Sequence, residues 1–249
     1  MAIYDKPTRL LMREMVEGLR LRPGAPVSRQ QVVAWFADKY PKLKPGTVTA
    51  HLTRMSTNSP SRTHHNVIAG EDDLFFQIDR GTYRLYDSNQ DPRPIYECSK
   101  NSKFELFGEE SETPDYEEGS AEFAYEADLK NYLAKNLSVI EPGLRLFHDD
   151  GVKGIEFPAG GRYIDILAVD AENNYVVIEL KVSRGYDRVV GQLMRYMAWI
   201  ATHQAGENQA VRGIIVAREI SEDLILASSL ISDVSMYEYQ LSLDVKKVV

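Results

Sequence analysis

Two patterns of apolar residues divide the first third of this chain into predicted helices and predicted strands. From Thr8 to Thr57, apolar positions recur every three or four residues in three short runs, which predicts three amphipathic helices. β-Branched and aromatic residues then fill 74–78 and 82–86 on either side of Asp79-Arg80-Gly81, which predicts a β-hairpin. The apolar stripes of the three helices are Leu11, Met15 and Leu19; Val32, Val33 and Phe36; and Val48, Leu52 and Met55.

Three helices followed by a hairpin predict a winged helix-turn-helix domain over residues 1–87, with Ser28 capping the second helix and Pro45-Gly46 opening the third. The third helix would enter the DNA major groove, and the hairpin would be the wing. No acidic residue occurs between Asp38 and Glu71, which favours phosphate contacts. A winged helix used for protein contacts or dimerisation is the alternative. The residues expected to contact DNA are Lys42, Lys44, Thr47, Thr49, His51, Arg54 and Arg62.

A polar, proline-containing stretch follows this domain and predicts a linker over residues 88–120. Its acidic run, 109–118, is interpreted as part of a solvated tether. A second hypothesis is that this run screens the basic surface or the cleft of the next domain until DNA displaces it.

Residues 121–249 alternate helical and strand patterns, which predicts an α/β domain. Their order, α-β-β-β-α-β, is typical of a central mixed β-sheet flanked by helices on both faces. The region 151–161 is expected to be a glycine-rich approach to the central hairpin. The predicted elements are a helix at 126–137 with Leu129, Tyr132 and Leu133 inward, strands at 144–147, 163–169 and 175–182, a helix around Gln192, a strand at 212–217, a helix at 221–229 and a strand at 234–243.

Charged residues interrupt the two central apolar strands. Glu179 and Lys181 share one face because side chains alternate along a strand. Asp165 joins them if Ala171, Glu172 and Asn173 form a three-residue loop with Asn173 in the left-handed conformation, because that register sets Asp165 opposite Glu179. A four-residue loop would separate them.

Two opposed carboxylates repel each other unless a cation lies between them, and oxygen ligands suit magnesium or manganese. A neighbouring lysine can orient water or stabilise charge on a phosphate, so the pattern predicts metal-assisted phosphodiester hydrolysis. A salt-bridged structural cluster is the alternative. On the following helix, Gln192 and Tyr196 lie four residues apart, within reach of the same hairpin face. The apolar stripe of that helix is Val189, Leu193, Met197 and Ile200.

Asp165, Glu179-Leu180-Lys181 and the segment Gln192 to Tyr196 together resemble the core of the PD-(D/E)XK nuclease superfamily, with the QxxxY element of its RecB-like branch. More closely, GRYIDILAVD, VVIELKV and GQLMRYMAWI are similar to the C-terminal domain of NucS/EndoMS-type DNA endonucleases, over about 122–217. The resemblance implies a restriction-endonuclease-like fold and a magnesium-dependent DNA endonuclease, with manganese as a possible substitute.

The same resemblance implies roles for individual residues. Asp165 and Glu179 would be the metal ligands, and Lys181 would activate water or stabilise the phosphate. Glu126 matches an acidic residue that the family supplies from the preceding helix, with Glu122 and Asp128 as neighbouring alternatives. NucS-type enzymes carry a β-rich N-terminal domain, which the pattern here does not predict. The complete implied catalytic set is Glu126, Asp165, Glu179, Lys181, Gln192 and Tyr196. Independently of the resemblance, Arg184 and Arg188 follow Lys181 in the chain and are expected to contact phosphate, with a solvated surface position as the alternative.

Composition adds bounds to this hypothesis. The 249 residues are 43% hydrophobic and 27% charged, as in ordinary globular proteins. A single cysteine, Cys98, excludes an internal disulfide framework and fits a reducing cytoplasm, and no long apolar run predicts export or a membrane span. The net charge of −8 opposes nucleic-acid binding overall, but the acid-free stretch around the third helix favours it locally.

The sequence therefore predicts a cytoplasmic DNA endonuclease in which the winged helix selects or positions duplex DNA and the C-terminal domain cuts it. Cutting both strands needs two sites, so a homodimer is expected. Restriction of foreign or modified DNA is the predicted setting. The alternatives are a DNA-repair or structure-specific endonuclease, and a catalytically inactive DNA-binding regulator.

Overall fold

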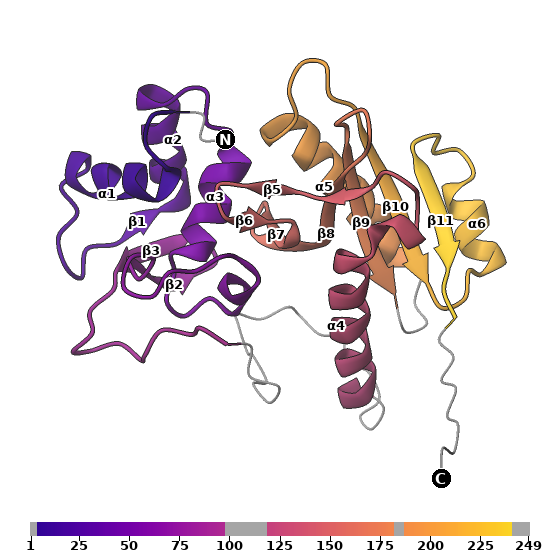
Figure 1. Ribbon diagram of the computed structural model, residues 1–249, viewed down its shortest axis with the longest axis horizontal. Helices are drawn as coiled ribbons and strands as arrows, with labels where there is room; N and C mark the ends of the chain where they lie inside the picture. Colours follow the sequence, from indigo (N-terminus) through magenta and orange to yellow (C-terminus); the bar gives the residue numbers. More distant parts are fainter. Residues whose placement is uncertain (1–3, 98–118, 182–186, 241–249) are drawn as a thin grey trace, which may run out of the picture.

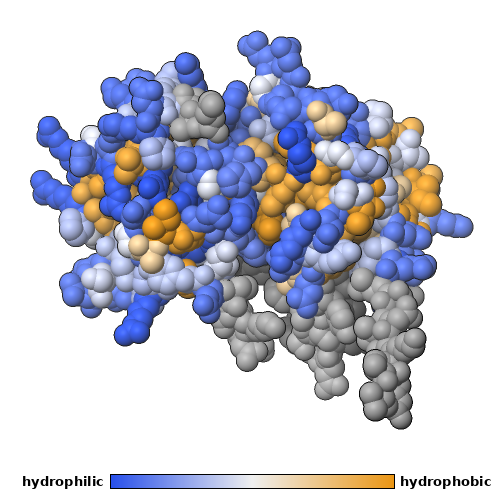
Figure 2. Space-filling model, viewed as in Figure 1, coloured by the Kyte–Doolittle hydropathy of each residue, from blue (hydrophilic) through white to orange (hydrophobic). Residues whose placement is uncertain are grey.

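The computed structural model describes residues 4–97, 119–181 and 187–240, which form two lobes joined side by side (Figure 1). The acidic run 109–118 and Arg184 lie outside these ranges. Among the described helices, none combines the length and apolarity needed to cross a membrane. On the face shown in Figure 2, hydrophilic residues dominate the N-terminal lobe, and apolar residues appear over the second lobe and at the margin where the last helix lies.

The N-terminal lobe contains the three predicted helices and the predicted hairpin. Ser28 caps the second helix, because its hydroxyl accepts from the Gln31 amide while the Gln31 side chain accepts from the Ser28 amide. The apolar stripes meet in one buried cluster that includes Met12, Phe36 and Leu52. The elements are α1 (Thr8–Gly18), β1 (Val27–Ser28), α2 (Arg29–Lys39), α3 (Pro45–Arg54), η1 (Pro60–His64), β2 (Phe75–Asp79) and β3 (Thr82–Leu85), with sheet order β1-β3-β2.

The second lobe is built on a mixed sheet, as predicted. Its order is β11-β10-β9-β8-β4, with β7 also paired to β8; β9, β10 and β11 run parallel, and β8 is antiparallel to its neighbours. The elements are α4 (Gly119–Lys135), η2 (Leu137–Val139), β4 (Arg145–Leu146), β5 (His148–Asp149), β6 (Val152–Lys153), β7 (Ile155–Ala159), β8 (Arg162–Val169), β9 (Tyr175–Lys181), α5 (Asp187–His203), β10 (Val211–Ala217), α6 (Glu222–Ser228) and β11 (Val234–Glu238).

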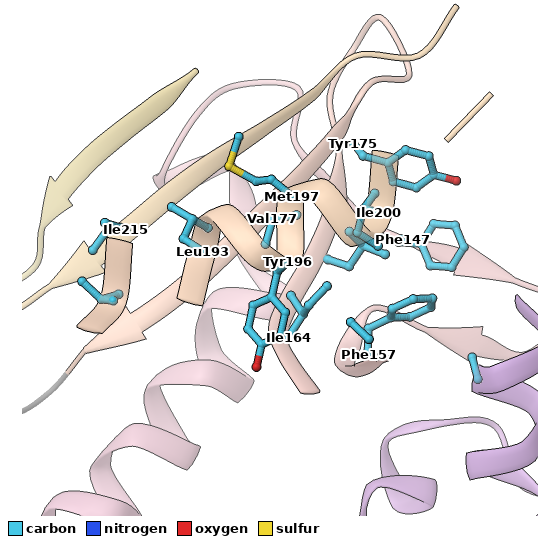
Figure 3. Close-up of a cluster of buried hydrophobic side chains, with 14 of the residues drawn as sticks. Phe147, Phe157, Ile164, Tyr175, Val177, Leu193, Tyr196, Met197, Ile200 and Ile215 are labelled. Atoms are coloured by element: carbon cyan, nitrogen blue, oxygen red, sulfur yellow. The ribbon is translucent and has the colours of Figure 1, made fainter. Parts of the chain in front are cut away.

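Helices cover both faces of this sheet. Leu129 and Leu133 of α4 pack on one face, whereas α5 and α6 pack on the other. Figure 3 shows the cluster on the α5 face, where the helix residue Leu193 lies near Val177 and Ile215 of the sheet.

Two details of this lobe differ from the sequence prediction. Tyr132 was expected inward but is 56% exposed, because Leu129, Leu133 and Ala134 form the buried face of α4 against the sheet. The region 151–161 is more than a glycine-rich approach, since it forms β6 and the antiparallel partner strand β7.

The predicted register of the central hairpin is confirmed. Val169 pairs with Tyr175, and Asn173 has a φ of 67°, in the left-handed region that a three-residue loop requires. The Asn173 amide donates to the carbonyl of Asp170, which closes the turn. The last ladder pair is Ile166 with Ile178, so one step further in the same register Asp165 faces Glu179.

Candidate active site

Asp165 and Glu179 lie where β8 and β9 separate. The Asp165 Oδ2 atom accepts a 2.9 Å hydrogen bond from the Leu180 amide, so this side chain continues the link between the strands after the backbone ladder ends. Lys130 Nζ of α4 lies 3.7 Å from the other carboxylate oxygen, Oδ1. The Asp165 side chain is 14% exposed and therefore faces a partly open site.

Glu179 is 2% exposed and is held mainly by the neighbouring helix. Its Oε1 atom accepts from Gln192 Nε2 at 2.5 Å and from Lys181 Nζ at 3.4 Å. Within the described residues, its Oε2 atom has no hydrogen-bond partner. A buried carboxylate oxygen without a hydrogen-bond partner costs free energy. This atom is therefore a candidate to bind a ligand that the described residues do not supply.

The electrostatics of the site reflect crowded acidic groups. Burial and, second, the charge of Asp165 raise the pKa of Glu179 to about 9, against the opposing effect of Lys181. The pKa of Glu126 is also raised, first by burial and then by Asp165. Glu126 therefore belongs to the same cluster. Asp128 of α4 is exposed, and the side chain of Glu122 lies outside the described residues.

Tyr196 completes the QxxxY pair from α5. Its ring is buried in the core on that face, and its hydroxyl points out of the cluster (Figure 3), 3.5 Å from Gln192 Nε2. Burial and then Glu179 raise the pKa of Tyr196 to about 12, so the hydroxyl stays protonated at neutral pH. The prediction that Gln192 and Tyr196 reach the hairpin face is confirmed.

Two members of this cluster were missed by sequence reasoning, Lys130 and Glu156. Lys130 follows Glu126 by four residues and so lies on the same face of α4, a signal that the sequence contained. Glu156 accepts from Lys130 Nζ at 2.9 Å, but it comes from β7, which was not predicted. Burial works to lower the pKa of Lys130, yet Glu156 and Asp165 outweigh it and raise that pKa.

The donor set fits a divalent cation. Within the described ranges, no group of three or more His, Cys, Asp or Glu side chains is already gathered as a metal site. However, among the described residues the Glu179 Oε2 atom has no partner, and burial and then the charge of Asp165 raise the pKa of Glu179. Carboxylate oxygens of this kind suit magnesium or manganese.

The polar face of α3 is buried, so the prediction that this helix presents Thr47, Thr49, His51 and Arg54 to the DNA major groove is wrong for this conformation. The second lobe covers this face: α3 packs against β6, β7 and α5, and Thr47 Oγ1 donates to Asp149 at 3.3 Å. Arg54 also donates to a carbonyl of that lobe, whereas Thr49 and Thr53 donate to carbonyls of their own helix. Among the described residues, neither ring nitrogen of His51 has a hydrogen-bond partner. The side chains concerned are Thr47, Thr49, His51, Thr53 and Arg54, each at most 4% exposed.

The predicted arginine contacts are also engaged within the protein. Arg54 donates to Asp72 at 2.9 Å and to the carbonyl of Asp150 at 2.7 Å. Arg62 is fully buried and pairs with Asp73 at 2.7 Å. These contacts make both arginines structural in this conformation. Lys42, Lys44 and Arg188 have exposed side chains, and Lys44 Nζ approaches the carbonyl of Ala205 at 3.4 Å.

Comparison with known proteins separates the two lobes. Residues 125–242 match the Endonuclease NucS C-terminal domain, and residues 7–85 match a domain of unknown function (DUF7669). Endonuclease NucS from Methanopyrus kandleri is 33% identical over 100 residues, which are 40% of this chain and 35% of that protein. Endonuclease NucS from Pyrococcus abyssi is 36% identical over 108 residues, 43% of this chain and 39% of that protein.

Among solved structures, a repair endonuclease from Pyrococcus abyssi is 30% identical, with a TM-score of 0.39, over 51% of this chain and 50% of that chain. This chain covers less than two fifths of the length of the two Endonuclease NucS proteins from Methanopyrus kandleri and Pyrococcus abyssi. The range that matches the NucS C-terminal domain, 125–242, includes Asp165, Glu179, Lys181, Gln192 and Tyr196. The C-terminal part of this chain is therefore similar in sequence to the C-terminal domain of Endonuclease NucS.

Proposed function

We propose that this chain is a metal-dependent DNA endonuclease. The observation that carries the proposal is the meeting of Asp165, Glu179 and Lys181 with Gln192 at one end of the sheet, inside a NucS-like domain. A structural salt-bridge cluster would have both carboxylates satisfied, whereas Glu179 Oε2 has no partner within the described residues.

The residues of the chain divide the work of hydrolysis between them. Asp165 and Glu179, with Glu126 nearby, would hold magnesium, or manganese in its place. The bound ion would supply Lewis-acid stabilisation of the phosphate and lower the pKa of water. Gln192 orients Glu179 through its hydrogen bond, and the Leu180 amide orients Asp165. Lys181, whose side chain is 24% exposed and also contacts Glu179 Oε1, would face the phosphate or the attacking water.

The N-terminal lobe is proposed to be a winged helix that positions duplex DNA. The order of its helices and the three-stranded sheet ending in the hairpin β2–β3 support this proposal. Because α3 is covered, DNA contact would come from exposed groups elsewhere. Lys42 and Lys44, in the loop before α3, and Arg188, at the start of α5, are the exposed basic candidates.

The biological setting is either restriction or repair. The curated relatives are named Endonuclease NucS, and one similar structure is described as a repair endonuclease, which favours repair chemistry for the C-terminal domain. The N-terminal lobe matches a different family, so this protein can select other DNA substrates than the NucS relatives do. Restriction of foreign or modified DNA is therefore the second candidate setting, and the cleavage assay below distinguishes it from repair. A homodimer would supply the two sites needed to cut both strands.

The test is cleavage of plasmid and phage DNA, unmodified and cytosine-modified, with magnesium. The intact protein is compared with Asp165→Ala and Lys181→Ala. Magnesium-dependent cutting that both variants lose is the expected result, and the preferred DNA separates restriction from repair. An absence of cutting by a protein that still shifts duplex DNA would instead identify a DNA-binding regulator.

A further inference from the structure

Lys130 lies between two carboxylates on paired strands of the sheet, Glu156 of β7 and Asp165 of β8. Its Nζ atom donates to Glu156 Oε1 at 2.9 Å and lies 3.7 Å from Asp165 Oδ1. The shorter contact is a hydrogen bond, and the longer one is only an ion pair. Lys130 is 9% exposed, so water does little to screen the two acids from its charge. Glu156 therefore attracts the Lys130 ammonium group, which would otherwise pair more closely with Asp165, a proposed metal ligand.

Glu156 is held in this position by the N-terminal lobe. Its Oε2 atom accepts from Ser61 Oγ at 2.6 Å, and His64 Nε2 lies 3.6 Å away; both residues belong to η1. Its backbone φ of 46° is in the left-handed region, which side chains other than glycine rarely adopt. A residue kept in such a conformation, with contacts on both sides, indicates a position determined by its surroundings.

We propose that Glu156 is a positioning residue that holds Lys130 away from Asp165, and that docking of the N-terminal lobe through Ser61 and His64 thereby sets the cation affinity of the nuclease site. The inference rests on the proposed metal-dependent function. It goes beyond that function by giving the N-terminal lobe a role within the catalytic site.

The proposal has a definite sign. When Glu156 loses its charge, Lys130 pairs fully with Asp165 and competes with a divalent cation for the same oxygen. Glu156→Gln should therefore weaken Mn²⁺ binding by about tenfold, a typical size for coupling within one ion-pair network. Lys130→Met removes the competitor, so this variant should bind Mn²⁺ at least as tightly as the intact protein.

A double-mutant cycle separates this mechanism from a general charge effect. If Glu156 acts through Lys130, the change Glu156→Gln has no effect on Mn²⁺ binding in the Lys130→Met background. If Glu156 only attracts the cation through space, the same weakening appears in both backgrounds, and the proposal is wrong. The measurement is Mn²⁺ binding to the full chain without DNA, followed by electron paramagnetic resonance of the free ion, with Asp165→Ala as the reference for loss of the site.

The role of the N-terminal lobe is tested in the same assay. The double variant Ser61→Ala/His64→Ala should weaken Mn²⁺ binding in the intact background and leave it unchanged in the Lys130→Met background. The matched control is Gln204→Leu, because Gln204 Nε2 also donates across the lobes, to Thr47 Oγ1 at 3.3 Å. Gln204 follows α5, twelve residues after Gln192 and so roughly 18 Å along the helix axis from it. This control should lower the melting temperature without changing Mn²⁺ binding.

The possible outcomes separate this inference from the proposed function. A protein that binds Mn²⁺ with the expected coupling but cuts no DNA refutes the endonuclease and supports the positioning role. DNA cleavage without coupling between Glu156 and Lys130 refutes the positioning role alone. If the Ser61→Ala/His64→Ala variant binds Mn²⁺ as tightly as the intact protein does, docking of the N-terminal lobe does not set the cation affinity of the site. Absence of Mn²⁺ binding by the intact chain overturns both. Melting curves verify that each variant is folded.

Discussion

The side-chain amide of Gln192 donates a 2.5 Å hydrogen bond to Oε1 of Glu179, which ties α5 to the end of β9. This bond occupies one oxygen of a buried carboxylate, and the other oxygen has no partner within the described residues. The helix thus determines which oxygen of Glu179 is available to a cation.

Replacing Gln192 by leucine should lower the cleavage rate. Hydrogen bonds to charged groups contribute about 1.5–3 kcal/mol, which corresponds to a loss of roughly 10- to 100-fold in kcat. Tyr196→Phe is the matched control on the same helix, since its hydroxyl approaches Gln192 only at 3.5 Å. That control should change the rate much less. Equal rates for Gln192→Leu and the intact protein would show that the bond does not organise the site.

Asp165→Asn should separate DNA binding from chemistry. The amide oxygen of asparagine can still accept from the Leu180 amide, so the end of the hairpin stays in place. The charge that would attract the cation is lost, and we expect at least a 100-fold loss of single-turnover cleavage. Gel-shift affinity for duplex DNA should stay within about twofold, because losing one carboxylate removes no phosphate contact. Retained cleavage would return Asp165 to a structural role.

Arg54 and Lys42 should behave in opposite ways. Arg54→Met leaves Asp72 buried without its charged partner, and breaking such a pair typically costs about 3–5 kcal/mol of unfolding free energy. Lys42→Ala, on the surface, should change stability by less than about 0.5 kcal/mol but weaken DNA binding and reduce its salt dependence. Urea unfolding and salt-dependent binding measure both. Weaker DNA binding by Arg54→Met without destabilisation would mean that α3 contacts DNA after all.

Acid should destabilise the contact between the lobes through His51 and His65. Burial, and then the charge of Arg54, lower the pKa of His51 to about 3. Burial, and then the charge of His51, lower the pKa of His65 to about 3. In the unfolded chain both histidines have a pKa of about 6.5. Between these values the unfolded chain binds protons that the folded chain does not, so stability falls as the pH falls through 6.5 and the loss ends near 3.

At pH 5 the expected loss is about 2 kcal/mol for each histidine. The raised pKa of Glu179 acts in the opposite direction, since the metal-free folded chain keeps a proton that the unfolded chain releases above about pH 4.5. Comparing His51→Leu with the intact protein cancels that contribution. Between pH 7.5 and pH 5, the variant should therefore lose about 2 kcal/mol less stability than the intact protein, measured by chemical denaturation. An unchanged pH dependence would show that His51 is not the group responsible.

The hairpin loop should tolerate glycine but not an inserted residue. Asn173→Gly keeps the left-handed φ and should be nearly neutral, whereas Asn173→Val should cost about 1–2 kcal/mol. One residue inserted after Glu172 would shift the pairing and turn Glu179 to the opposite face of the sheet. Cleavage should then disappear while the circular dichroism spectrum is retained. An active insertion variant would mean that the register does not determine the site.

The sequence by itself determined the parts of this protein that depend on local pattern. The alternation of side chains in β9 and the three-residue loop at Asn173 were enough to set Asp165 opposite Glu179. The four-residue spacing of Gln192 and Tyr196 brought both to that face. Capping and apolar spacing likewise determined the three N-terminal helices. All of these relationships act over a few residues or across one tight turn, so they can be predicted from the sequence.

What covers α3 and what surrounds Asp165 depend on packing between segments that are distant in the chain. A threonine or histidine that faces a polar protein surface has the same spacing along a helix as one that faces water. The spacing of polar and apolar residues in α3 therefore could not predict that His51 is buried. Glu156 reaches Lys130 because β7 pairs with β8, and it reaches Ser61 because the lobes dock. Contacts between segments so far apart depend on how finished elements pack together, and periodicity carries no information about that packing.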